Sequence, residues 1–135
     1  MKKKRIIAII EKTSFGYTVY SDDLPRISGS GETVEDAKRN IKENISFILR
    51  RHDKRGTRPS SSLNNGLLVW NYKYDVESIF KSFPMVDADG FVRNLNLHPL
   101  LRYHKTGITL ASEKQAQKIT SNLHALGREL LSIHL

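Results

Sequence analysis

The alternation of apolar and polar residues predicts several strands in the first half of the chain. Residues 5–11 (RIIAIIE) form a β-branched run with polar ends, typical of a central strand buried on both faces or nearly so. After a turn at residues 14–16, residues 17–20 resume strand character, so the two runs should pair as a hairpin. Residues 28–32 are short and glycine-rich, which indicates an irregular third strand, and residues 67–74 predict a last strand returning to the sheet.

An amphipathic helix is predicted between the third and the last strand. Thr33 is a good N-cap, and Asp36 in the first turn complements the positive end of the helix dipole. Apolar residues then recur at spacings of three and four, so one face of the helix should be buried against the sheet. These residues are Val34, Ala37, Ile41, Ile45, Ile48 and Leu49.

From Asp75 onward the pattern is helical. Asp75 and Asp87 can each cap a short helix. Pro99 suits the first position of a third helix over residues 100–106, because its missing N–H would have no partner there anyway. Ser112 opens a long last helix with a capping box. Four helices with a tight turn between the second and the third outline a helix-turn-helix domain.

Composition narrows the class of protein. A chain of 135 residues suffices for one domain or two small ones, and without cysteine it can form neither a disulfide framework nor a thiolate metal site. No apolar run approaches the ~20 residues that a membrane span needs. The N-terminal stretch lacks the features of a signal peptide. We therefore expect a cytoplasmic protein without membrane contact.

The positive charge is concentrated in the first half of the chain. Residues 1–74 carry 15 Lys or Arg against 8 Asp or Glu, whereas residues 75–135 carry 7 against 6. One basic cluster runs from Arg50 to Arg58, and such clusters attract nucleic-acid phosphates through counterion release. The alternative is that some of these cations interact with the negative, C-terminal end of a helix dipole and the others lie on a solvated loop.

The first 74 residues resemble the HicB antitoxin family. The resemblance rests on the order of elements, on an acidic-Leu-Pro segment and a Gly-x-Gly turn, and on the start of the helix. The matching residues are Asp23, Leu24, Pro25, Gly29, Gly31, Thr33, Glu35 and Ala37. The chain departs at Arg26-Ile27, where the family commonly has Gly-Cys. The resemblance implies a HicB-like α/β domain over residues 1–74, with a partial ribonuclease H-like sheet and one packed helix. Its polar stretch at about residues 53–66 lacks periodicity and contains Gly, Pro and a serine run, which predicts a flexible loop.

Residues 75–135 resemble the lambda-repressor-like helix-turn-helix domains that follow some HicB domains, through segments such as 80–84 and 100–103. The implied fold class is α+β followed by an all-α helix-turn-helix domain for DNA binding and dimerisation, with Pro99–Thr106 as the recognition helix in the major groove. Arg102 would contact guanine, and Lys105 a phosphate or base. The predicted DNA-binding residues are Pro99, Arg102, Tyr103, Lys105, Thr106, Ser112 and Lys114. Alternatively, these are ordinary solvated side chains.

The last helix carries an apolar seam over more than two heptads. The seam consists of Ala116, Ile119, Leu123, Leu126, Leu130 and Ile133. We expect it to pair two subunits and set the separation of DNA half-sites, to pack on Phe80, Phe91 and Leu101 of its own domain, or to do both, because Leu131 and Leu135 add a second apolar edge.

These features predict an antitoxin of a HicAB-type toxin-antitoxin system. The resemblance implies that the chain neutralises a HicA-like toxin that cleaves messenger RNA, represses its own promoter by binding operator DNA, and forms a homodimer or higher homo-oligomer. The alternative is a stand-alone transcription regulator whose first domain dimerises or senses a ligand.

An enzyme is the rival from another class, because ribonuclease H-like nucleases hold metal with convergent carboxylates. Here the candidates lie at element boundaries, where turns and capping explain them. They are Glu11, Asp22, Asp23, Glu32 and Asp75. We therefore expect no catalytic residues, no metal and no cofactor.

Overall fold

A computed structural model describes residues 3–57, 67–95, 101–103 and 108–135. The chain divides into two compact units, Met1–Lys73 and Tyr74–Leu135. None of the helices in the described ranges combines the length and the apolar character that crossing a membrane requires.

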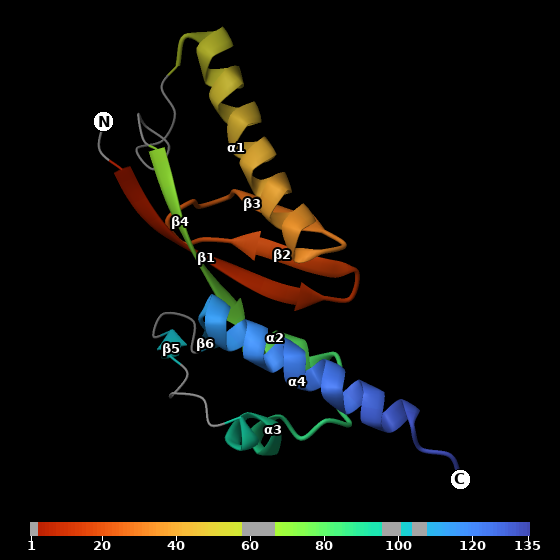
Figure 1. Ribbon diagram of the computed structural model, residues 1–135. Coiled ribbons are helices and arrows are strands. Elements are labelled where there is room, and N and C mark those ends of the chain that lie inside the picture. The colour runs from red at the N-terminus through yellow and green to blue at the C-terminus, as the bar shows by residue number, and fades with distance from the viewer. Residues whose placement is uncertain (1–2, 58–66, 96–100, 104–107) are drawn as a thin grey trace. The chain divides into compact units, whose positions relative to one another are not determined.

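The first unit is an α+β arrangement with one helix packed on a sheet (Figure 1). Its elements are β1 (Lys3–Thr13), β2 (Gly16–Tyr20), β3 (Ser28–Gly31), α1 (Val34–Arg55) and most of β4 (Leu67–Asp75). The strand order is β3-β2-β1-β4. β1 and β2 form the predicted hairpin, with Ile10 opposite Val19 and Thr13 opposite Gly16. The core of the first unit contains Ile6, Ala8, Ile9, Ile10, Val19, Leu24, Ala37, Ile41 and Ile45.

The start of α1 follows the sequence prediction. Thr33 is the N-cap, and its side chain accepts a hydrogen bond from the Asp36 backbone N–H at 3.1 Å. The helix continues to Arg55 and ends at Gly56 in the left-handed conformation, with φ 65°. Residues 53–55, which the sequence prediction placed in the flexible loop, are therefore helical, and residues 58–66 lie outside the described ranges.

The Gly-x-Gly motif of β3 allows α1 to approach the strand closely. A Cβ atom on Gly29 would lie 2.3 Å from the backbone N of Ile41, and one on Gly31 would lie 2.4 Å from Cβ of Asp36. Both distances are shorter than atoms tolerate, so any side chain at these positions would push the helix off the strand. The motif is thus explained by packing.

The acidic-Leu-Pro segment lies at the end of the β1–β2 pair that is farther from the connecting turn. Pairing of the two strands extends only to Ile9 and Tyr20. Beyond it, the Asp23 carboxylate accepts a hydrogen bond from the Ile7 backbone N–H at 3.1 Å, replacing a missing strand partner. Leu24 is buried in the core. Arg26 has φ 67°, a left-handed conformation that glycine adopts at much lower cost.

The outer edge of β3 is covered by side chains of α1. The Ser30 backbone N–H donates to Oδ1 of Asn40 at 3.0 Å, and Nδ2 of Asn44 donates to the Ser28 carbonyl at 2.8 Å. These bonds satisfy backbone groups that an edge strand otherwise offers to another chain. β3 is therefore a poor template for added strands.

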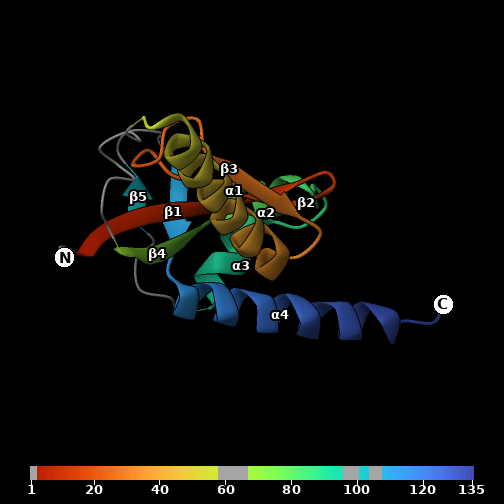
Figure 2. The same cartoon turned by 90° about the horizontal axis from the view of Figure 1, so that it is seen from above.

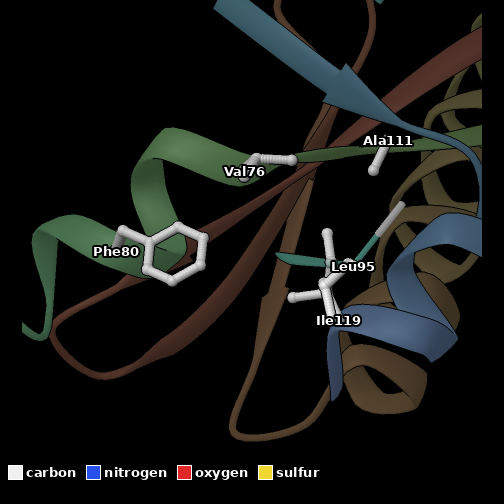
Figure 3. Close-up of a cluster of buried hydrophobic side chains, with 5 residues drawn as sticks. All are labelled: Val76, Phe80, Leu95, Ala111 and Ile119. Atoms are coloured by element: carbon white, nitrogen blue, oxygen red, sulfur yellow. The ribbon is translucent and has the colours of Figure 1, made fainter. Parts of the chain in front are cut away.

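The second unit mixes helices and strands. It contains α2 (Val76–Lys81), α3 (Ala88–Asn94), β5 (Leu101–Tyr103), β6 (Ile108–Ala111) and α4 (Glu113–Leu131). The end of β4 pairs with β6, Tyr74 opposite Ala111, and β6 pairs with β5. Figure 3 shows the core cluster, formed by Val76, Phe80, Leu95, Ala111 and Ile119. The predicted caps of α2 and α4 are confirmed, since Asp75 accepts from the Ser78 N–H and Ser112 forms a capping box with Gln115.

The predicted all-α second domain is wrong. Strand β5 lies where the sequence analysis placed a recognition helix, and β6 lies between that segment and α4. The fold is therefore mixed α+β and is not followed by a helix-turn-helix domain. The Leu-Arg-Tyr run at 101–103 fits one helical turn and a short strand equally well. Pairing with β6 decides between them. A helix this short has little stability of its own. The hydrogen bonds to β6, a tertiary contact, therefore decide the conformation of the segment.

Candidate functional site

The predicted DNA-binding residues are not brought together on one helix. Arg102 and Tyr103 lie in β5, so the predicted helix Pro99–Thr106 is wrong at these positions. The structure does not describe Pro99, Lys105 or Thr106. Ser112 and Lys114 lie at the start of α4, where the Ser112 side chain accepts from the Gln115 N–H at 3.2 Å and Lys114 is exposed. The hydroxyl of Ser112 is thus engaged in capping its own helix.

The apolar seam of α4 divides into two parts. Ile119 is 1% exposed and belongs to the core cluster, and Leu123 packs against that cluster together with Phe91. The intramolecular packing on Phe80 and Phe91 that the sequence analysis left open is therefore present in this part. Leu130 and Ile133 are both 57% exposed. Figure 2 shows the last turns of α4 projecting past α2 and α3.

An apolar groove lies between the α2–α3 connection and the second half of α4. Its volume is about 730 Å³. Phe83, Met85 and Phe91 line one side, and Leu126 and Leu130 line the other, with Asp87 contributing a carboxylate. Phe83 is 50% and Met85 97% exposed. A contiguous apolar surface of this kind usually marks an interaction site.

Gly127 lies on α4 beside Leu126 and three residues before Leu130. Glycine within a helix costs about 1 kcal/mol relative to alanine. A Cβ atom at this position would meet nothing within 4 Å. Packing inside the unit therefore does not require glycine here, whereas close approach of a second helix would.

Trp70 and Tyr72 of β4 are engaged within the first unit. Their rings stack with centroids 5.7 Å apart and an interplanar angle of 11°. Lys38 Nζ lies 4.3 Å from the Tyr72 centroid and Lys42 Nζ lies 5.8 Å from that of Trp70. These contacts join α1 to β4 and engage both rings within the first unit.

Asp75 is the buried carboxylate at the start of α2. Burial raises the pKa of Asp75 above its ordinary value, although the hydrogen bond from the Ser78 N–H opposes this shift. Its geometry is that of a helix cap, because the Ser78 hydroxyl also donates to the Asp75 carbonyl at 2.7 Å. Within the described ranges, no group of three or more His, Asp or Glu residues is placed to hold a metal ion.

The sequence analysis missed the α2–α3 side of the apolar groove. Phe83 continues the apolar spacing of Val76, Ile79 and Phe80, which predicts a buried position on the helix, but α2 ends at Lys81 and leaves Phe83 beyond it. Met85 follows Pro84 and belongs to no periodic pattern. The sequence signal that could have identified this side of the groove is the pair of large apolar residues that flank Pro84.

Comparison of the chain with known protein families, curated proteins and solved structures finds no match.

Proposed function

We propose that this chain is an antitoxin of the HicB type whose first unit binds and neutralises a small toxin that cleaves messenger RNA. The proposal rests on the resemblance of residues 1–74. The observation that carries it is the conformation of Arg26. This residue stands where the family commonly has glycine, and its φ of 67° is one that favours glycine.

Most of the other residues of the resemblance also have identifiable structural roles. Gly29 and Gly31 allow the close approach of α1, Asp23 completes the hydrogen bonding of β1, and Thr33 caps α1. A pattern most of whose members satisfy a requirement of the same unit supports a common fold better than isolated matches do.

We further propose that two copies of the chain associate through the apolar groove and the second half of α4. Five large apolar side chains there are half exposed or more, namely Phe83, Met85, Leu130, Leu131 and Ile133. They expose on the order of 600 Å², so a symmetric pair would bury about 1,200 Å², the lower end of the range for stable interfaces. A two-fold interface uses the same patch on both copies, and Gly127 permits the close approach of two helices.

Repression of the promoter stays a prediction. The described residues between α3 and α4 contain no helix that could enter the major groove.

Co-expression with the product of any small reading frame next to the gene for this chain tests the antitoxin proposal. We expect a stable complex and recovery of growth from the toxin. Gly29→Val, which should disrupt the first unit, is expected to abolish the recovery, and Leu130→Glu in the second unit should retain it. If no complex forms and the chain alone binds its upstream DNA, the stand-alone regulator is favoured instead.

Sedimentation velocity tests the pairing proposal. We expect wild type to dimerise and Leu130→Glu to be at least tenfold weaker in pairing, because it places a charge in an apolar interface. Gln117→Glu adds the same charge at an exposed polar position of α4 and should pair normally. A monomeric wild type at micromolar concentration contradicts the proposal.

A further inference from the structure

The C-terminal half of α1 has an exposed face that the core of its unit does not use. The buried residues of α1 are Ala37, Ile41 and Ile45. Residues 46–55 follow, and at 1.5 Å per residue they lengthen the helix by about 15 Å. Figure 1 shows these turns passing beyond β2 and β3.

One aromatic and four basic residues form a stripe on these turns, which we call the basic stripe. Its members are Phe47, Arg50, Arg51, Lys54 and Arg55, at spacings of three, four, seven and eight that share one side of a helix. All are exposed, and Phe47 is 55% exposed. The Arg51 guanidinium carbon lies 5.9 Å from the Phe47 ring centroid.

The charge of the basic stripe is not balanced by neighbouring carboxylates. The ion pairs that the structure describes on α1 lie near its start, Lys38 with Glu35 at 3.6 Å and Arg39 with Asp36 at 3.0 Å. Among the described residues, no ion pair involves a cation of the basic stripe. Asp53 is the only acidic residue in the sequence from 46 to 55.

Helix capping explains only part of this arrangement. Cations in the last turn interact favourably with the negative end of the helix dipole, which accounts for Lys54 and Arg55. The same role does not require Arg50 and Arg51 one turn earlier, nor an exposed aromatic ring at Phe47. The contact between Arg51 and Phe47 holds a cation and an aromatic ring side by side on the exposed face. A partner that is both anionic and able to stack fits this pair together with Arg50.

We propose that the basic stripe binds single-stranded nucleic acid. Arginine and lysine side chains neutralise the phosphates, and the Phe47 ring offers a surface on which an unpaired base stacks. A base within a duplex is already stacked and paired, so the ring favours a single strand. Binding is a property of this chain alone and does not depend on the antitoxin proposal.

Fluorescence anisotropy with the full chain tests the inference. The probes are mixed-sequence RNA and DNA single strands of about 12 nucleotides, within the usual site size, and a DNA duplex of equal length. We expect both single strands to bind more tightly than the duplex. Between roughly 50 and 200 mM salt, contact with three or four phosphates gives a log–log slope of about −2 to −3. Tighter binding of RNA or of DNA identifies the source of the strand, and either result supports the inference.

Matched variants separate stacking from charge. Phe47→Ala should weaken single-strand binding about tenfold with an unchanged salt slope, and Arg51→Gln should lower the slope by about 0.7. The controls are Phe15→Ala, an aromatic 92% exposed in the β1–β2 turn, and Lys118→Gln, an exposed cation of α4. Circular dichroism verifies that each variant is folded.

Three results overturn the inference. The wild-type chain could fail to bind any probe, or bind the duplex more tightly with no effect of Phe47→Ala. The controls could also lose as much affinity as the stripe variants, which would show diffuse attraction to the net charge of +8.

Discussion

The two units of the chain differ in where their exposed apolar side chains lie. In Met1–Lys73 the core joins β1, β2, the loop after β2, and α1. In Tyr74–Leu135 the core cluster holds five buried residues, while Phe83, Met85 and Leu130 remain exposed around a groove. The first unit exposes Phe15 in the β1–β2 turn and Phe47 on α1, which are separate elements, whereas the second gathers its exposed apolar side chains around one groove and keeps that surface available for assembly.

The largest expected effect is at the close contact between β3 and α1. Gly29→Val should destabilise the first unit by more than about 4 kcal/mol, because its Cβ would collide with the backbone of Ile41 and β-propensity cannot compensate. Urea unfolding measures the loss. Ser30→Val, at the neighbouring exposed position of the same strand, is the control and should stay within about 1 kcal/mol of wild type. Similar losses in both variants would show that the close contact is not what constrains position 29.

A second prediction contrasts the two parts of the α4 seam. Ile119→Ala should cost about 2–4 kcal/mol because it opens a cavity in the core cluster. Leu130→Ala should change the stability of the monomer by less than about 0.5 kcal/mol, since its side chain is largely exposed. Thermal unfolding at a concentration below that of pairing measures both. Equal costs would mean that the seam is buried along its whole length.

A smaller gain is expected at Arg26. Arg26→Gly should raise the free energy of unfolding by about 0.5–1 kcal/mol, because glycine adopts φ 67° without steric cost. The gain is partly offset because the unfolded chain is more flexible with glycine. Arg26→Ala removes the same side chain yet keeps Cβ, so it should bring no gain. Chemical denaturation distinguishes the two, and a gain in the alanine variant would attribute the effect to the arginine side chain.

The smallest effect concerns the ionisation of Asp75. The pKa of Asp75 is raised by burial, so the folded protein holds this proton more tightly than the unfolded chain does. Its contribution to stability is therefore greatest at low pH and declines as pH rises from the ordinary aspartate pKa of about 3.9 to the raised folded pKa.

Asp75→Asn removes this decline and keeps an N-cap acceptor, so at pH 7 it should lie within about 1 kcal/mol of wild type. Urea unfolding of both proteins across the acid range measures the difference. A difference that stays constant with pH would contradict the raised pKa.

Much of the first unit follows from local sequence signals that agree with one another. The β-branched run at residues 5–11, the cap at Thr33 and the spacing of Ala37, Ile41 and Ile45 each act over a few residues. The structure confirms them as β1, the start of α1 and its buried face. Of the candidate interaction surfaces, the sequence analysis identified the basic cluster and the seam residues, but not the α2–α3 side of the groove.

In the second unit the sequence alone determined the caps at Asp75 and Ser112, because a cap depends on side chains within three residues of it. Tertiary structure decided that residues 101–103 and 108–111 are strands, since their hydrogen-bond partners lie on each other and on the end of β4. It also decided which residues of the α4 seam are buried. Ile119 and Leu130 belong to the same apolar pattern, and only the packing of α2, α3 and β6 against α4 covers one and leaves the other exposed.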